Sequence, residues 1–362
     1  MRFWYGAALA AAMVAAMVAG TASARDLVVP ADKGWMHAQT RLIVRSSVAG
    51  LNRVAITDAT TTEHDIAVKL ESPDKSVFAT LFLFHPAVPS VPLWFDRSRI
   101  AIEERRNFDK GAPASADPIA FAPSGSGPAV ALRQSWSLLS SPYRSTSLAV
   151  MPIGEWLLVV RLTAEKLTAN ALDARMDEMI AALKPAIATT PAYPGPAAPV
   201  AVCATQTDFA HLPKAKLEKS SSSNPLFTLL MNAAVMDQAE KDKANPKAEP
   251  VTPAAPLCRD GIATTMFGVY RREGNDSDGY MIALADAGRT VDVFPDLMSQ
   301  IEKRKTRSYT VRLNDVDASA SSYPSFNALP RPDQVVDLIA KGTPTAKSQG
   351  KNIIINSRTL GS

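Results

Sequence analysis

The chain has 362 residues and a mass of 38.7 kDa, with 39 Lys and Arg against 35 Asp and Glu and only two cysteines. Its hydrophobic fraction of 46% and charged fraction of 20% are ordinary for a folded protein and exclude general disorder. Two cysteines are too few for a small scaffold stapled by disulfides, so we expect a globular protein with its own hydrophobic core.

Residues 1–24 are predicted to be a secretory signal peptide. Arg2 gives a positive start, residues 6–20 form an uncharged apolar run, and Ala22-Ser23-Ala24 is the small-residue pattern that signal peptidase cleaves. The alternative is a retained membrane anchor, but a bilayer crossing needs about 20 apolar residues and this run is short. We therefore expect cleavage after Ala24 and a periplasmic or secreted protein with no membrane span.

A proline-rich stretch predicts where the chain divides. Residues 185–200 carry five prolines among Ala, Thr and Gly, and proline fixes φ and removes a backbone donor. We expect a first domain over 25–184, a Pro/Ala-rich linker over 185–200 and a second domain over 201–362. A second proline-rich stretch, 245–256, lies between the two cysteines and is expected to be a loop within the second domain.

The first domain shows strand and helix patterns in turn. Residues 77–84 are apolar on both alternating faces, which predicts a central strand. Ser90 and Pro92 predict a helix that ends near 106. Residues 148–151 and 156–162 predict a hairpin around 152–155, and apolar residues at helical spacing predict a closing helix over 172–183.

This order resembles the α/β/α sandwich of PsbP-like and DcrB-like extracytoplasmic domains. The resemblance rests on Gly154-Glu155-Trp156, on the strand ending Arg161-Leu162-Thr163 and on the closing helix, and it covers about residues 41–183. Members of that group mostly act as accessory or assembly proteins without known catalysis. The resemblance implies the same role here and says nothing about the second domain.

The second domain is expected to begin with a short strand over 200–203 and a helix from Pro225 to Lys243. Strands are predicted over 262–270, 280–285, 290–294 and 309–313, and helices over 297–303 and 332–340. The predicted fold class is therefore α+β, with two domains that each contain a mostly antiparallel sheet with packed helices, joined by the proline-rich linker.

Cys203 and Cys258 are predicted to form a disulfide, because export takes them into a compartment where thiols are commonly oxidised. A catalytic or metal-binding role is the alternative, but the two cysteines lack a C-x-x-C spacing and have no neighbouring histidine. Whether they pair within one chain stays open at this point.

The other residues that could carry chemistry form no strong motif. The four histidines show no ligand spacing, so no metal or other cofactor is expected; His64 is expected at the surface and His85-Pro86 at a strand end. Residues 72–75 match S-x-x-K, but Pro-Asp between strand-like runs favours a turn. Residues 275–279 fail the full EF-hand pattern, which favours a polar turn over a calcium site.

Two basic features of the sequence could contact a negatively charged group. The run over 303–307 is predicted to be a solvated helix end, with an anionic lipid, a cell-wall polymer or an acidic protein face as the alternative. Arg161 lies on the Leu157 and Val159 face of an apolar strand, so either that face is partly wet or the arginine has a buried carboxylate partner.

The sequence predicts no catalytic, cofactor-binding or metal residues. The expected function is that of a non-enzymatic exported envelope accessory or adaptor protein that binds another protein, with no nucleic acid as partner after export. The alternatives are a hydrolase or a small-ligand carrier with its site at the interdomain cleft. The sequence leaves the oligomeric state open.

Overall fold

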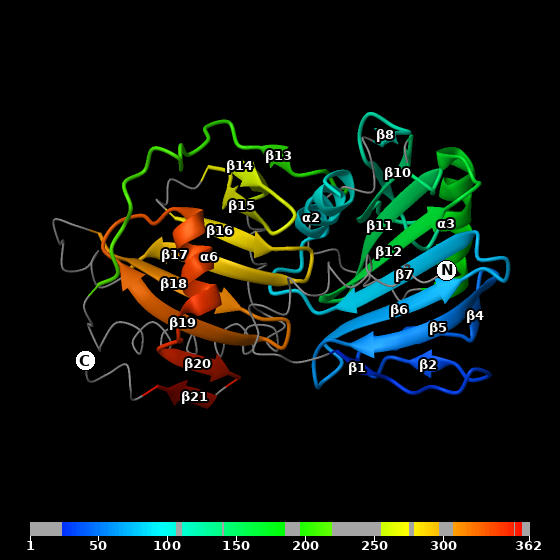
Figure 1. Ribbon diagram of the computed structural model, residues 1–362, viewed down its shortest axis with the longest axis horizontal. Helices are drawn as coiled ribbons and strands as arrows, with labels where there is room; N and C mark the ends of the chain where they lie inside the picture. The colour runs from blue at the N-terminus through cyan, green and yellow to red at the C-terminus, as the bar shows by residue number, and fades with distance from the viewer. Residues whose placement is uncertain are drawn as a thin grey trace, which may run out of the picture. The chain divides into compact units, whose positions relative to one another are not determined.

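The computed structural model describes residues 24–105, 111–139, 141–184, 196–218, 255–274, 279–296, 307–350 and 352–356. The chain divides into two compact units (Figure 1). The first contains residues 1–200 with two short segments, 264–266 and 285–288, and the second contains 201–263, 267–284 and 289–362. The domain limits of 184 and 200 stay predictions, because 185–195 lie outside the described residues.

The predicted α+β class is wrong, because strands dominate the described residues. Strands hold 42% of them and three helices hold 14%, and the strands form large antiparallel sheets. Several strands were not predicted because they are short or rich in Ser and Ala, which gives them no clean alternation of apolar and polar residues. Packing in the sheet overrides their weak local preference.

The first unit contains a sheet with the order β1-β5-β6-β7-β12-β11-β10-β8, in which β4 also pairs with β5 and β9 with β10. A separate two-stranded hairpin, β2 with β3, lies beside it. The strands are β1 (Arg25–Asp26), β2 (Trp35–Met36), β3 (Ile43–Val44), β4 (Ser47–Val48), β5 (Leu51–Asp58), β6 (Asp65–Glu71), β7 (Val77–Phe84), β8 (Ala112–Pro113), β9 (Ile119–Phe121), β10 (Ala131–Ser137), β11 (Ser145–Ile153) and β12 (Trp156–Ala164).

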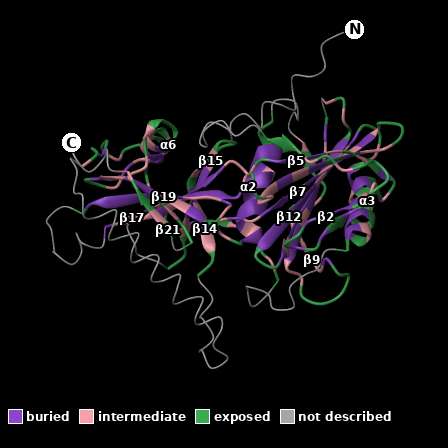
Figure 2. Ribbon diagram, turned by 90° about the horizontal axis from the view of Figure 1, so that it is seen from below, coloured by how far each residue is buried: buried purple, intermediate pink, exposed green. Residues whose placement is uncertain are grey.

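Two helices pack on opposite faces of this sheet, whose central strands are buried (Figure 2). Helix α3 (Ala169–Leu183) buries Leu172, Met176 and Ile180 in one core cluster with alternate residues of β11 and β12. Helix α2 (Val91–Glu103) covers the other face, where Trp94 meets Phe84 edge to face with ring centroids 5.9 Å apart. Ser90 caps α2 as predicted, since its hydroxyl accepts from the Leu93 amide.

The second unit contains a nine-stranded sheet that follows chain order from β13 to β21. Every pairing is antiparallel except that of β13 with β14, which is parallel. The elements are β13 (Ala201–Val202), β14 (Leu257–Ala263), β15 (Phe267–Arg272), β16 (Tyr280–Leu284), β17 (Arg289–Pro295), β18 (Tyr309–Asn314), β19 (Ser319–Phe326), α6 (Pro332–Lys341), β20 (Ala346–Gln349) and β21 (Asn352–Ile355).

The predicted disulfide is confirmed. Cys203 and Cys258 are bonded within one chain with a Cα–Cα distance of 4.8 Å, and both are buried. Cys203 follows β13 directly and Cys258 lies on β14, so the bond ties the parallel pair together. It therefore supports the one pairing in this sheet that a hairpin cannot close.

Other predicted elements differ in detail. The strand predicted over 262–270 is wrong, because β14 ends at Ala263, β15 begins at Phe267 and a turn lies between them. The helices predicted from Pro225 and over 297–303, the polar turn at 275–278 and most of the basic run at 303–307 lie outside the described residues.

Two residues singled out above have structural partners. The carboxylate of Asp286, in a segment of the first unit, accepts from the Arg161 guanidinium, and the neighbouring cations hold the pKa of Asp286 below its ordinary value despite burial.

Ser72 lies in the β6–β7 turn, where its hydroxyl donates to Asp74 at 2.6 Å. Hydrogen bonds from Ser72 and Ser76 lower the pKa of Asp74 to about 2. The S-x-x-K match is thus a turn.

Candidate functional site

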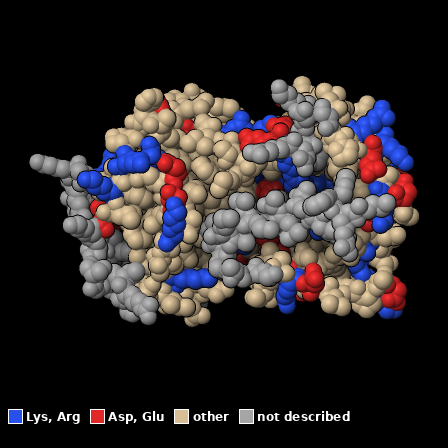
Figure 3. Space-filling model, in the orientation of Figure 1, with Lys and Arg blue, Asp and Glu red and all other residues tan. Residues whose placement is uncertain are grey.

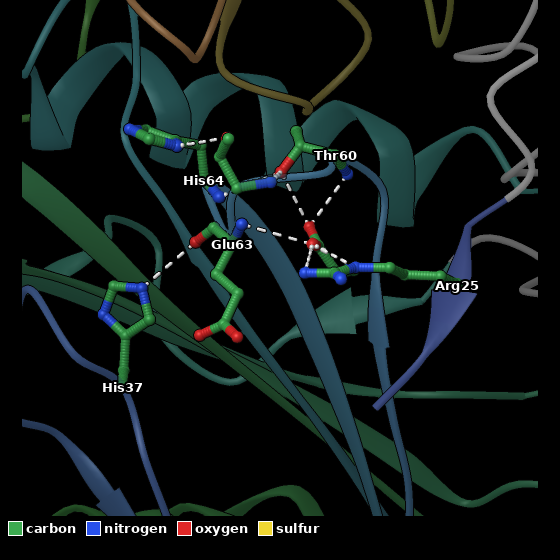
Figure 4. Close-up of polar contacts among 7 residues, drawn as sticks. Arg25, His37, Thr60, Glu63 and His64 are labelled. Atoms are coloured by element: carbon green, nitrogen blue, oxygen red, sulfur yellow. Dashed lines mark hydrogen bonds and ion pairs between the residues drawn. The ribbon is translucent and has the colours of Figure 1, made fainter. Parts of the chain in front are cut away.

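At one end of the first sheet, a buried carboxylate holds a loop in place. Asp58 ends β5, is fully buried and accepts from Arg25 Nε at 3.0 Å across the β1–β5 pair (Figure 4). It also accepts from the amide and hydroxyl of Thr60 at 2.8 and 2.7 Å and from the Glu63 amide at 3.2 Å. These bonds fix the loop 59–64 between β5 and β6.

A buried histidine holds the same loop from the other side. The Nδ1 atom of His37 accepts from the Thr40 amide at 3.2 Å, so the ring proton is assigned to Nε2, which donates to the Glu63 carbonyl at 3.0 Å. Burial lowers the pKa of His37 below its ordinary value of 6.5. His37 is therefore a neutral hydrogen-bonding bridge between the loops 37–42 and 59–64.

Glu63 lies between these two supports. Its amide is bound by Asp58 and its carbonyl by His37, and its φ of +59° is in the left-handed region, which is unfavourable for a residue with a Cβ. Its carboxylate makes no hydrogen bond or ion pair within the part of the chain that the structure describes, and Figure 4 shows it directed away from the Asp58 network. The two loops thus present one unpaired acid.

A small pocket opens next to this acid. It has a volume of about 220 Å³, is open to solvent, and is lined by Arg25, His37, Glu63 and residues 38–39 and 61–62. Pockets that enclose drug-sized ligands are larger, about 300–1,000 Å³, and mostly apolar. This pocket, which we call the Glu63 pocket, has the size of a single side chain or a small polar molecule.

Three of the four histidines gather around Trp156 at this end of the sheet. The ring centroids of His37, His64 and His85 lie 4.6, 5.4 and 5.3 Å from that of Trp156. Trp156 begins β12, while His64 precedes β6 and His85 follows β7, and strand pairing brings the three ends together. We call these four residues the histidine–tryptophan cluster.

The hairpin that carries His37 exposes apolar side chains. Met36 and Ile43 are cross-strand partners on β2 and β3 and are 43% and 50% exposed, while Trp35 and Val44 on the opposite face are buried in the core. Because His37 directly follows Met36, the exposed pair begins one residue from the Glu63 pocket. The hairpin therefore carries an exposed apolar pair, and His37, which follows Met36 at the end of β2, lines the Glu63 pocket.

The sequence missed this site. Each histidine was considered on its own, whereas the structure places His37, His64 and His85 close together. The fourth histidine, His211, is exposed and bonded to Asp208. His64 Nδ1 is hydrogen-bonded to the Thr62 hydroxyl at 2.7 Å. Within the described residues, no three His, Cys, Asp or Glu side chains are grouped to hold a metal ion.

Comparisons with known proteins return no relative: no family model, no curated protein and no solved structure matches the chain. Across the described ranges, no helix is both long enough and apolar enough to span a membrane.

Proposed function

We propose that this protein is exported to the cell envelope and acts there by binding another protein, without catalysing a reaction. The signal-peptide pattern over 1–24 and the Cys203–Cys258 disulfide support a periplasmic or secreted location. The resemblance of residues 41–183 to PsbP-like and DcrB-like domains supports an accessory or assembly role.

The observation that carries the proposal is the exposed Met36 and Ile43 pair on the hairpin whose next residue, His37, lines the Glu63 pocket. Apolar side chains next to a polar recess are a common arrangement in protein interfaces, where an apolar centre is bordered by polar contacts. On the face drawn in Figure 3, the basic and acidic side chains of the described residues alternate in small groups. Local contacts therefore offer more specificity than a general charge attraction.

The hydrogen bonds of Asp58 and His37 favour a structural role over a catalytic one for these two residues. Asp58 and both ring nitrogens of His37 are engaged in holding the loops 37–42 and 59–64. A general base needs a lone pair that is free to take a proton from a substrate. These groups serve instead to fix the shape of a surface, which is what a docking site requires.

The test is a pull-down of the tagged mature protein from its own envelope extract at low and high salt, with bound proteins identified by mass spectrometry. We expect one dominant partner at near-equal stoichiometry that resists salt. Met36→Ser combined with Ile43→Ser should release it, while Ile119→Ser, at a residue 44% exposed on β9, should not. Absence of a partner at both salt concentrations, or retention by the double variant, would contradict the proposal.

Export has its own test. Cleavage after Ala24 would make Arg25 the first residue of the mature chain, and β1 begins at that residue. N-terminal sequencing of the protein from its native envelope should read Arg-Asp-Leu. A chain that retains residues 1–24 would contradict cleavage and favour an anchored form.

A further inference from the structure

We propose that the Glu63 pocket binds a cationic side chain, lysine or arginine, of the partner protein. This inference rests on the proposed function, since it names the chemistry by which that partner is recognised.

The charges around the pocket leave one acid uncompensated. Arg25 approaches the Asp58 carboxylate through both Nε and Nη2 at 3.0 Å, so these two charges neutralise each other. His37 is neutral in its hydrogen-bonding arrangement, because Nδ1 accepts from the Thr40 amide. The Glu63 carboxylate remains, so the side chains of Asp58, Arg25 and Glu63 together carry a net charge of −1, a count that does not include the terminal ammonium group that cleavage after Ala24 would leave on Arg25.

The backbone of Glu63 is held in place before any ligand arrives. Both backbone polar groups of Glu63 are bonded, the amide to a fully buried carboxylate and the carbonyl to a buried imidazole. A residue with a Cβ stays in the left-handed region only when its surroundings determine the conformation. Because its backbone is already ordered, Glu63 loses less conformational entropy when its carboxylate forms a charge-assisted hydrogen bond than a glutamate on a mobile loop does.

The remaining lining suits the same ligand. Thr61, Thr62 and Gln39 supply hydroxyl and amide oxygens that can accept from an ammonium or a guanidinium group. A volume of about 220 Å³ accommodates the end of one such side chain.

The experiment titrates the isotope-labelled mature protein with Nα-acetyl-lysinamide and Nα-acetyl-argininamide, and observes the backbone amides by NMR. Nα-acetyl-glutaminamide is the neutral control probe. The cationic probes should shift the amides of residues 60–64, and Glu63→Gln should weaken that binding about five-fold. Glu165→Gln, at an exposed acid of the same unit, should leave binding unchanged. The titration is repeated on a chain that begins at Ala22, so that a terminal ammonium group on Arg25 cannot compete.

The outcomes separate the two proposals. Equal shifts with the neutral probe, or cationic binding that survives Glu63→Gln, would overturn the pocket assignment. If the envelope partner is captured equally by the wild type and by Glu63→Gln, the binding function stands and the cationic recognition fails. If the cationic probes bind through Glu63 but no partner is captured, the pocket assignment stands and the protein-binding function fails.

Discussion

His37 makes the stability of the first unit depend on pH. In the folded protein its Nδ1 accepts from the Thr40 amide, and the groups that face it are Glu63, Asp58, His64 and the rings of Trp35 and Trp156. Burial lowers its pKa below 6.5, so the unfolded chain takes up the proton more readily than the folded chain. The stabilisation is therefore complete above pH 6.5 and is lost as the pH falls below that value.

We expect His37→Gln to reduce this loss, because glutamine can donate to the Glu63 carbonyl and accept from the Thr40 amide without titrating. Urea unfolding followed by tryptophan fluorescence should show a steeper fall for the wild type between about pH 7 and about pH 5, by at most about 1.4 kcal/mol per pH unit. His211→Gln, at an exposed histidine, is the control. Parallel pH profiles for wild type and His37→Gln would show that His37 does not govern the effect.

Asp58 is expected to matter more for the loop than for the sheet. In Asp58→Asn the side chain loses an acceptor that binds the Glu63 amide and the charge that pairs with Arg25, so we expect the free energy of unfolding to fall by about 1–3 kcal/mol. Hydrogen exchange should rise first at the amides of residues 60–64. Asp26→Asn, on the same strand as Arg25 but exposed, should change neither quantity. Unchanged exchange in the loop would contradict the role assigned to Asp58.

At the scale of the elements, helix α3 is held by its buried stripe. Met176 is completely buried against β10, β11 and β12, and its truncation in Met176→Ala leaves a cavity. We expect a loss of about 2–5 kcal/mol in the free energy of unfolding, measured by urea denaturation. Asn170→Ala, at an exposed position of the same helix, should stay within about 0.5 kcal/mol of the wild type. Similar losses in both variants would show that the helix is not anchored by this stripe.

The elements with a strong local pattern were predictable. The central strand β7 has the predicted limits 77–84, and α2, α3, β16, β17, β18 and α6 lie close to the predicted ranges. The polar strands β10 and β19 were not predictable. Several of their Ser residues are buried in the folded sheet, so their sequences do not show the alternation of apolar and polar residues that indicates a strand. Strands β5 and β6 were also not predicted, although the buried residues Ile66, Val68 and Leu70 alternate along β6. The strand content was therefore underestimated, and the fold class followed that error.

Part of the candidate site could have been predicted from the sequence. Residues 72–75 were already expected to form a turn, and counting outward from that turn pairs Asp65 with Phe84 and so places His64 beside His85. The contact of His37 with Trp156 was not predictable, because it depends on how the β2–β3 hairpin lies on the core, which no local pattern encodes. The unpaired state of the Glu63 carboxylate likewise depends on tertiary hydrogen bonds.

For the whole molecule, the disulfide should stabilise one unit and not the other. The separation of 55 residues between Cys203 and Cys258 gives about 4 kcal/mol of stabilisation in the chain-entropy model. All tryptophans of the described residues lie in the first unit, at 35, 94, 136 and 156. After reduction, circular dichroism should show the second unit unfolding at lower urea while tryptophan fluorescence stays unchanged. A shift of the fluorescence transition would show that the bond stabilises both units.

The chain-order arrangement of the second sheet has a kinetic consequence. From β14 onward, each strand pairs with the strand that precedes it in the sequence, whereas in the first sheet Phe84 must find Leu157 before β7 and β12 can join. Contacts between residues that are distant in sequence slow folding, because the intervening chain must be ordered first. With its disulfide intact, the second unit should therefore form its sheet before β7 and β12 pair at the centre of the first sheet.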